Sequence, residues 1–555
     1  MESKPAGDFR FRPLAKVRLL VFLSFFAGLS QTLFAATPGV EGQWGPRINF
    51  TTVPISAAVL PNGKLLIFSS WDRFDFTSGD GARNKTYVNL YNPATGQVTE
   101  FLVTQTNHDM FCPGTAFLED GRLLVNGGGP QVTTTSIYDF SANQWARGTS
   151  MSRRRWYNAS TTLPGGGVFT LGGIPEDGVG ELWTPGVGWS VLAGAPVTPM
   201  TRDGGSYMPR SEQHPKVLVA PSGRLFAAGP TPNMQWYDTA SGGSVQFAGR
   251  RGDDIYAQNN VTVMFDVGKI LTAGGSPRYD AAGGQPPASA NAYVIDINSA
   301  VSTRKIASMQ HGRSYANGVV LPDGRVLVVG GKGDGQAFSD TAAVFFPEMF
   351  DPGTETWATM ARQATPRTYH STAVLLPDGR VFSGGGGLCG DCGVNHADGE
   401  IYSPPYLFQG PRPVIQGAPT VVGYNAPFSI STTGDVARFT FVRLSSTTHT
   451  VNTDQRFLEL QSAPAGGGSF TVTSPLNANI APPGYYMLFA LSAAGVPSVS
   501  KIMKLSAKGA PVGGGSFRYV RLEEVSEVSG RPWGSAAELN VLDTSGNTIG
   551  RTGWV

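Results

Sequence analysis

The hydrophobic positions of the chain follow a pattern that recurs seven times. Each copy has a turn glycine, a short apolar run and a glycine-rich end, as in Gly324-Arg-Val-Leu-Val-Val-Gly-Gly331. The copies begin at Gly63, Gly121, Gly166, Gly223, Gly268, Gly324 and Gly379. Successive starts are 58, 45, 57, 45, 56 and 55 residues apart, which indicates one repeated structural unit.

Periods of about 50 residues with a Gly-Gly strand end are typical of kelch-type blades. We expect each copy to supply an apolar inner strand, followed by a run that ends in Tyr or Trp, as in Ser136-Ile-Tyr-Asp139 with Trp145. Such blades stack radially around an axis because one blade cannot bury both of its faces. A series of β-sandwiches would also show short strands, but not seven similar units. The pattern predicts an all-β protein with a seven-bladed kelch-type β-propeller over residues 37–404.

The repeat stops after Tyr402. Prolines mark a linker, and alternating strands such as Ala437-Arg-Phe-Thr-Phe-Val442 follow. The size and turn spacing of residues 405–507 predict one Ig-like (early-set) β-sandwich. Residues 508–555 form a glycine-rich linker and a segment too short for its own core, which resembles an incomplete discoidin-like tail.

The first 36 residues have the pattern of an export signal. Basic residues precede the apolar run from Leu19 to Ala27, and the small residues Ala35 and Ala36 follow. A membrane anchor is the alternative, but the run is shorter than the ~20 apolar residues of a spanning helix. We therefore expect residues 1–36 to be a signal peptide and the mature protein to be secreted, with no membrane span.

Composition narrows the classes of partner. The 72 glycines, 40 prolines and 15% charged residues suit an all-β protein with many tight turns, and 41% hydrophobic residues argue against disorder. A formal net charge of +2 gives no electrostatic reason to expect nucleic acid or an anionic membrane as partner. We expect a monomer that acts on small molecules.

The chain has three cysteines. Cys389 and Cys392 are close enough in sequence to form a disulfide with each other, which leaves Cys112 as the odd thiol. A buried, inert thiol is the simplest interpretation of Cys112.

Candidate chemistry lies in four short segments. They are His108-Asp-Met-Phe-Cys-Pro-Gly114, Arg155-Trp-Tyr-Asn158, Tyr369-His370 and Thr448-His-Thr-Val-Asn-Thr-Asp-Gln-Arg456. His370 and His449 belong to different predicted domains. Two imidazoles with a neighbouring phenol suit a transition metal such as copper, although a lone histidine is more often a hydrogen-bonded structural residue. We interpret the other histidines, at positions 108, 214, 311 and 396, as structural.

All four segments, in this order, resemble the copper site of the galactose oxidase and glyoxal oxidase family. The similarity runs along the propeller and the sandwich and includes Leu376-Pro-Asp-Gly-Arg-Val-Phe382. It implies one copper ion and a thioether between Cys112 and Tyr157 that carries a tyrosyl radical, which would account for the odd cysteine.

The resemblance also assigns roles to the remaining residues. Tyr157, His370 and His449 would be equatorial copper ligands. Tyr369 would be the axial ligand and the base that takes the proton of the substrate hydroxyl. A primary alcohol, a galactose-type sugar or a similar substrate would become an aldehyde, and O₂ would become hydrogen peroxide. Arg210 and Tyr279 match family positions that contact the substrate.

The chain departs from galactose oxidase at two relevant positions. Galactose oxidase has a tryptophan stacked over the thioether shortly after the Gly-Gly that follows the linked tyrosine, and this chain has Gly172-Gly-Ile-Pro-Glu-Asp177 there. We do not expect Trp156 to replace it, because adjacent strand side chains point to opposite faces. Asp280 stands where galactose oxidase has glutamine, so galactose itself is less favoured as substrate. Arg210 could instead form a surface ion pair with Glu212.

Other functions remain open at this point. Glyoxal-oxidase-like oxidation of small aldehydes to acids is one alternative. A non-catalytic secreted kelch module that binds a glycan or a protein is another. A propeller hydrolase would need converging carboxylates or an arginine triad, and no such motif stands out.

Overall fold

The computed structural model describes residues 37–507, except 78–82, 175–177, 255 and 281–285. The predicted signal peptide and the C-terminal tail lie outside the described residues. Strands dominate the described part, in which a four-residue helix, α1 (Pro38–Glu41), precedes the first strand. None of its helices is long and apolar enough to cross a membrane.

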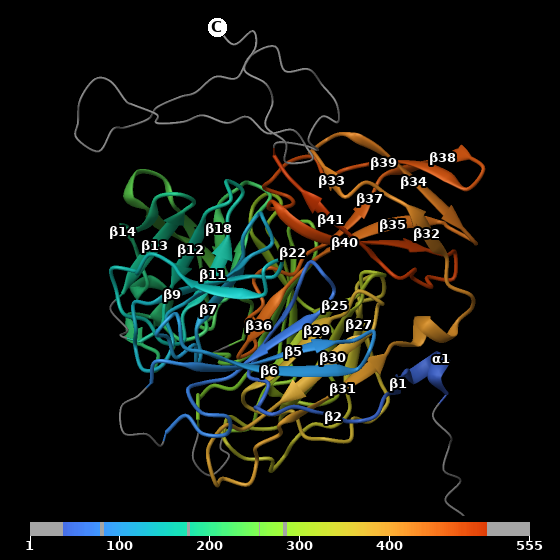
Figure 1. The fold of residues 1–555 in the computed structure, drawn as a ribbon. Helices are drawn as coiled ribbons and strands as arrows, with labels where there is room; N and C mark the ends of the chain where they lie inside the picture. The colour runs from blue at the N-terminus through green and yellow to red at the C-terminus, as the bar shows by residue number, and fades with distance from the viewer. Residues whose placement is uncertain (1–36, 78–82, 175–177, 255, 281–285, 508–555) are drawn as a thin grey trace, which may run out of the picture.

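Seven antiparallel sheets form the blades of a β-propeller, and a two-sheet sandwich lies beside it (Figure 1). From the axis outwards, the first three blades contain β3 (Ser56–Val59), β4 (Leu65–Phe68), β5 (Thr86–Asn92) and β6 (Gln97–Val103); β7 (Gly114–Phe117), β8 (Leu123–Asn126), β9 (Thr135–Asp139) and β10 (Gln144–Arg147); and β11 (Ala159–Thr162), β12 (Val168–Leu171), β13 (Val179–Thr184) and β14 (Gly188–Pro196).

The next three blades contain β17 (Val217–Val219), β18 (Leu225–Ala227), β19 (Asn233–Asp238) and β20 (Ser244–Arg250); β21 (Val261–Asp266), β22 (Lys269–Ala273), β23 (Ala292–Asp296) and β24 (Ser302–Lys305); and β25 (Ser314–Val320), β26 (Val326–Lys332), β27 (Glu348–Asp351) and β28 (Thr356–Thr359). A small hairpin of β15 (Arg202–Asp203) and β16 (Ser206–Tyr207) lies between the third and fourth blades.

The seventh blade closes the ring with strands from both ends of the propeller. It contains β29 (Ser371–Leu375), β30 (Val381–Gly385) and β31 (Asp398–Ser403), and β31 pairs with β1 (Gln43–Trp44) and β2 (Ile48–Asn49). The first described strands therefore complete the last blade, which leaves no open gap between the chain ends of the ring.

The fold class predicted from the repeat is confirmed. The repeated run was expected to form the innermost strand of each blade, and it does not. The first strands of neighbouring blades, such as β25 and β29, contact one another around the axis. The repeated glycine-led run forms the second strand, as β26 and β30 do. Both strands are buried on both faces, so their apolar patterns are alike and the sequence could not tell which is nearer the axis.

The Gly-Gly strand ends leave room for the segments of neighbouring strands. Gly385, at the end of β30, has φ of 79°, and a Cβ there would clash with the carbonyl oxygen of Pro54 and lie 2.9 Å from that of His370. A side chain would therefore displace the segments that carry Pro54 and His370.

The second domain is a β-sandwich with its own apolar core. One sheet contains β32 (Val414–Gly417), β34 (Pro427–Thr433), β39 (Ser469–Thr473) and β38 (Ser462–Gly466). The other contains β33 (Val421–Val422), β41 (Lys501–Leu505), β40 (Gly484–Leu491), β35 (Arg438–Arg443) and β37 (Phe457–Leu460). Phe439, Phe441 and Leu488 pack between these sheets.

One short strand leaves the sandwich and joins the propeller. β36 (Ser446–Thr448) pairs antiparallel with β3, the inner strand of the first blade, from Ser56↔Thr448 to Ala58↔Ser446. Figure 1 shows β36 among the blades, away from the other strands of its domain. The segment from β36 to β37 therefore lies in the central channel, which the inner strands of the blades surround.

Candidate metal centre

The four candidate segments meet at the axis because each lies at an end of an inner strand. Cys112 lies two residues before β7, Tyr157 lies two residues before β11, and His370 directly precedes β29. His449 directly follows β36, which occupies the inner edge of the first blade. Three blades and the sandwich thus each send one side chain to the same place.

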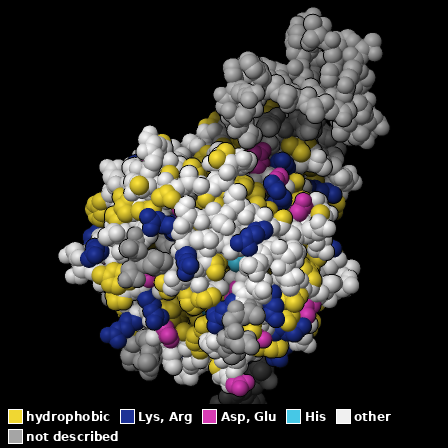
Figure 2. Space-filling model, turned by 60° about the vertical axis from the view of Figure 1, so that its left-hand side comes forward, with side chains coloured by type: hydrophobic (Ala, Val, Ile, Leu, Met, Phe, Trp, Pro, Cys, Tyr) yellow, Lys and Arg dark blue, Asp and Glu magenta, His cyan; other side chains and the backbone are white. Residues whose placement is uncertain are grey.

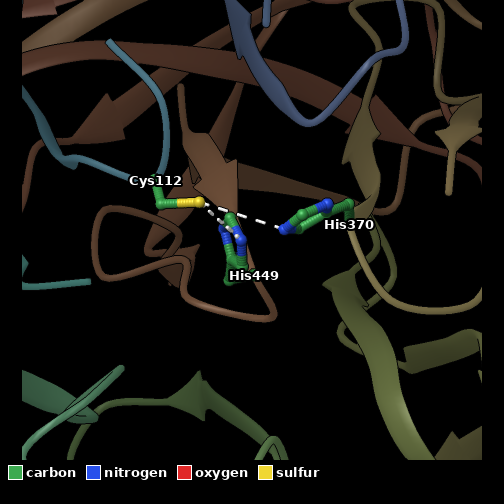
Figure 3. A group of neighbouring side chains, drawn as sticks. All are labelled: Cys112, His370 and His449. Carbon is green, nitrogen blue, oxygen red and sulfur yellow. Dashed lines mark hydrogen bonds between the residues drawn. The ribbon is translucent and has the colours of Figure 1, made fainter. Parts of the chain in front are cut away.

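Cys112, His370 and His449 point toward one another (Figure 3). Cys112 Sγ lies 3.0 Å from His449 Nε2 and 3.9 Å from His370 Nε2. The three candidate ligand atoms lie within 4.8 Å of one another, and all three residues are buried. The ring of His449 is 5.6 Å from that of Tyr157 and 5.5 Å from that of Tyr369, measured between centroids.

The backbone at these residues is in the left-handed region. The φ angles are 56° for Cys112, 69° for Tyr157, 70° for His370 and 50° for His449. Non-glycine residues rarely adopt such angles, and the cost is about 1–3 kcal/mol each. Each bend breaks the alternation of the adjoining strand and turns the side chain toward the axis.

Hydrogen bonds fix which nitrogen of each histidine is available. His370 Nδ1 bonds the carbonyl oxygen of Gly387, which can only accept, so Nδ1 carries the proton. His449 Nδ1 lies 2.7 Å from Thr448 Oγ1, whose own proton goes to the carbonyl oxygen of Ile55. The hydroxyl therefore accepts from Nδ1. Both Nε2 atoms are therefore unprotonated and direct a lone pair at the cluster, where His449 Nε2 accepts from the Cys112 thiol.

Burial favours the uncharged form of each of these groups. It lowers the pKa of His370 to about 3 and holds that of His449 well below its usual value. It also raises the pKa of the Cys112 thiol and of the Tyr157 and Tyr369 phenols well above their usual values. Neutral imidazoles can bind a metal, whereas the thiol and phenols give up protons readily only when a cation offsets the desolvation of their anions.

Trp156 stacks on Tyr157, contrary to the expectation from strand alternation. Their ring centroids are 4.6 Å apart with 17° between the planes. The expectation is wrong because Tyr157 has positive φ and the segment is not a regular strand; Trp156 forms only an isolated bridge with Ile174. Trp156 therefore supplies an indole face to Tyr157 from the preceding residue.

Tyr369 connects the cluster to the protein surface. Its hydroxyl hydrogen-bonds the hydroxyl of Tyr279. The guanidinium of Arg210 lies over the Tyr279 ring, 5.2 Å from its centroid, and its Nη1 is 4.0 Å from a carboxylate oxygen of Asp280. The side chains of Arg210 and Asp280 are 48% and 43% exposed. The ion-pair partner of Arg210 is thus Asp280 and not Glu212, the partner considered from the sequence. Glu212 is buried and accepts a hydrogen bond from Tyr207.

The surface of the molecule carries no single strongly charged region in the view of Figure 2. Lys and Arg side chains are scattered among uncharged and hydrophobic ones on that face.

His214 is a site residue that the sequence interpretation missed. Its ring stacks on that of His449, with centroids 4.8 Å apart and 12° between the planes, and its Nε2 lies 3.5 Å from the hydroxyl of Tyr279. The sequence alone predicts a structural role for it. Its place four residues after Arg210, a candidate substrate contact, was the available signal.

The other predicted features lie around this cluster. Cys389 and Cys392 form a disulfide, and Cys112 is the free, buried cysteine. His108 is fully buried, and both of its ring nitrogens bond neighbouring groups, Ser136 Oγ and the carbonyl oxygen of Gly127. It therefore serves the fold of the Cys112 segment.

The class of the protein is a β-propeller with a buried Cys/His/Tyr cluster at its axis, and comparison with known proteins gives the family. Residues 412–505 match the family described as galactose oxidase-like, Early set domain, and residues 257–389 match the one described as glyoxal oxidase N-terminus. Galactose oxidase of Gibberella zeae is 36% identical over 535 residues, which cover 90% of this chain and 77% of the relative. Aldehyde oxidase GLOX of Vitis pseudoreticulata is 28% identical over 437 residues, covering 72% and 82%.

A solved structure extends this similarity. It is described as a novel fungal alcohol oxidase with catalytic diversity among the AA5 family, in complex with copper. It is 40% identical, with a TM-score of 0.79, and the match covers 84% of this chain and 99% of that chain. The chain belongs to the galactose oxidase and glyoxal oxidase family of copper-radical oxidases.

Proposed function

We propose that this protein is a secreted copper-radical oxidase that converts a primary alcohol to the aldehyde while O₂ is reduced to hydrogen peroxide. The observation that carries the proposal is the convergence of two imidazole Nε2 atoms, two phenols and one free thiol in a buried cluster. The similarity to a copper-bound fungal alcohol oxidase supports it.

The donor set fits copper. His370 and His449 present Nε2 lone pairs whose orientation their Nδ1 bonds fix, and Tyr157 and Tyr369 add two phenols. Imidazole suits copper, and a phenolate is an available anion. These four residues would hold the ion, which would accept one electron and acidify the bound alcohol.

The second electron acceptor would be a thioether-linked pair made from Cys112 and Tyr157. The two residues are held together by a backbone hydrogen bond from Tyr157 to the Cys112 carbonyl, 3.0 Å long, and lie in one apolar cluster. Forming the C–S bond removes one S–H and one aryl C–H hydrogen, and O₂ takes the two electrons and two protons. The stacked Trp156 covers one face of the resulting ring.

Tyr369 would take the proton of the substrate hydroxyl at its phenolic oxygen. The Tyr279 hydroxyl bonds that oxygen and so holds its orientation. Arg210, exposed over Tyr279, would donate its fork of N–H groups to neighbouring hydroxyls of the substrate. Oxidation removes two electrons and two protons from the alcohol, and one O₂ accepts both pairs.

Two alternative functions are less well supported than the oxidation of a primary alcohol. Oxidation of small aldehydes to acids is supported by the plant aldehyde oxidase relative, which is less identical than the galactose oxidase and covers less of this chain. A non-catalytic binding module would not need a free buried thiol beside two preoriented imidazoles. Galactose is a weaker candidate than other primary alcohols because Asp280, a carboxylate paired with Arg210, lies at the mouth of the site.

The test is peroxide release by copper-loaded, air-exposed protein with galactose, simple primary alcohols, glyoxal and methylglyoxal. We expect release with primary alcohols, one bound copper per chain, and a Cys112–Tyr157 species about two mass units lighter than the sum of its peptides. The variant Tyr157→Phe should bind copper more weakly and form no link. Bound copper without peroxide from any substrate, or unlinked Cys112 and Tyr157 peptides in copper-loaded protein, would contradict the proposal.

A further inference from the structure

A buried lysine bonds the residue that follows His449, one of the proposed copper ligands. Lys216 precedes β17, the inner strand of the fourth blade, and its side chain points into the central channel, where only 3% of the residue is exposed. Lysine is almost never fully buried unless its ammonium is paired. Among the described residues, no carboxylate forms an ion pair with Lys216. Its place in the channel therefore calls for another explanation.

The Lys216 ammonium bonds one residue of the sandwich domain twice. Its Nζ donates to the carbonyl oxygen of Thr450 at 2.8 Å and to Thr450 Oγ1 at 2.6 Å. Thr450 is the residue after His449. Two hydrogen bonds to a single residue define its position and its orientation together, which one bond does not.

The clamped residue lies in a strained turn. His449 and Thr450 have φ of 50° and 66°, two consecutive non-glycine residues in the left-handed region. A backbone hydrogen bond between Thr448 and Val451 closes this turn. Because such angles are costly, the surroundings must hold them. Two side chains reach this turn from the segment that leads into the fourth blade: His214 stacks on His449, and Lys216 bonds Thr450.

Farther along the channel, other hydrogen bonds hold the sandwich segment to the blades. Thr453 Oγ1 donates to the carbonyl oxygen of Ser160, and Asp454 accepts from Thr162 Oγ1. Lys216 differs from these groups because it is a cation that bonds the residue next to His449.

We infer that Lys216 is a positioning residue that clamps the His449–Thr450 turn and thereby aims His449 Nε2 at the copper. The inference rests on the proposed function, since it concerns the same metal. It gives Lys216, which lies outside the four predicted ligand segments, a part in positioning one of the ligands. It also accounts for the burial of Lys216 without an ion-pair partner among the described residues.

The test compares copper binding by the full-length protein with and without the clamp. Lys216→Met keeps the length of the side chain and removes its donors. We expect its copper affinity to fall by about 10- to 100-fold, as for other residues that orient a ligand. The electron paramagnetic resonance spectrum of bound Cu(II) should change as well, because the direction of the His449 nitrogen changes.

A matched pair of threonine variants separates the clamp from general loosening of the segment. Thr450→Val removes one acceptor of Lys216, and Thr453→Val removes a hydroxyl bond of the same segment that is farther from His449. We expect Thr450→Val to weaken copper binding by roughly fivefold, the value of one hydrogen bond, and Thr453→Val to keep wild-type affinity and spectrum. The double variant Lys216→Met/Thr450→Val should bind no more weakly than Lys216→Met.

The outcomes decide between the two proposals. A wild-type protein that binds no copper overturns the proposed function itself. A wild type that binds copper, with Lys216→Met unchanged in affinity and spectrum, overturns only the role of Lys216. If Lys216→Met does not fold, equal losses in Thr450→Val and Thr453→Val overturn the inference, and a loss confined to Thr450→Val supports it.

Discussion

The propeller and the sandwich contribute to the site in different ways. The propeller holds Tyr157 and His370 on segments that lead straight into β11 and β29, whose positions the stacked blades fix. The sandwich holds His449 on a segment that has left its own sheets and lies against β3. The core of the sandwich, around Phe439 and Leu488, does not reach His449.

The two regions also differ in what fills them. Blades pack through apolar side chains, and one hydrophobic cluster spans several blades and the adjoining sandwich strands. The channel segment is buried but polar. Asp454 there accepts hydrogen bonds from the Phe117 backbone, Thr162 and Ser446 and lies 3.6 Å from an Arg443 nitrogen. Apolar packing thus sets the scaffold, whereas directional hydrogen bonds set the ligand that arrives from the other domain.

The largest effect should come from removing that ligand. His449→Ala should abolish copper binding at micromolar metal and all peroxide release, while the melting temperature of the metal-free protein stays close to that of the wild type, because the apolar cores lie elsewhere. Metal analysis, a peroxide assay and a melting curve check this.

The surface residue His311 provides the control for His449. It stacks on Phe346 away from the cluster, and His311→Ala should bind copper and release peroxide normally. If His449→Ala had a lower melting temperature but still bound copper, His449 would be a structural residue and not a metal ligand.

The second effect tests a propeller residue whose role is proton transfer. Tyr369→Phe keeps the ring, which contacts His370 at 3.9 Å between centroids, and deletes only the phenolic oxygen. We expect copper and the Cys112–Tyr157 link to remain and turnover to fall by about 10²–10⁴-fold, the usual contribution of a general base.

Tyr315→Phe serves as the comparison for Tyr369→Phe. Tyr315 packs on Tyr369, but its hydroxyl donates to the Gly335 carbonyl and accepts from the Asp280 backbone N–H, and it does not bond the Tyr369 oxygen. Its loss should change turnover little. Equal losses in the two variants would indicate that packing, and not the Tyr369 oxygen, is what matters.

A smaller effect is expected at the stacked indole. Trp156→Leu keeps an apolar side chain but removes the ring that lies 4.6 Å from Tyr157. Such aromatic pairs contribute about 0.5–1.5 kcal/mol, so turnover should fall by no more than about tenfold. The visible absorption of the oxidised, copper-loaded protein should shift. An unchanged spectrum would mean that the stack does not affect the linked ring.

The last effect concerns the stability of the metal-free protein and not its activity. Burial lowers the pKa of Lys216 from 10.5 to about 7. Between these values the unfolded state binds a proton at Lys216 that the folded state lacks, so the free energy of unfolding contributed by Lys216 rises with pH from about 7 to 10.5 and is lowest below 7. In denaturant titrations, the free energy of unfolding of the wild type should therefore increase relative to that of Lys216→Met as pH rises. If the difference between the two proteins did not change with pH, Lys216 would have the same pKa in the folded and unfolded states.

The blade repeat was readable from sequence because hydrophobic burial and turn geometry are local. Seven glycine-led runs predicted seven blades, and the structure has them. Which strand of each blade is nearest the axis was predicted wrongly, since β25 and β26 are both fully buried and differ only in what they contact in space.

The sequence predicted those site residues that belong to short, recognisable segments. Cys112, Tyr157, Tyr369, His370 and His449 stood out as short segments. His214 and Trp156 did not, because their relation to the site depends on bends at positive φ that strand alternation does not anticipate.

The sequence by itself determined the repeated blades, the sandwich that follows them and the residue types available to a metal. These depend on periodic apolar positions, glycine turns and short motifs, all of which act over a few residues. Only the tertiary structure decided that β36 joins the first blade, that Lys216 of the fourth blade clamps Thr450, and that His449 therefore faces His370. The contacts of β36 with β3 and of Lys216 with Thr450 join segments more than 200 residues apart, and the geometry of all three contacts is fixed by the packing of two domains rather than by any local preference.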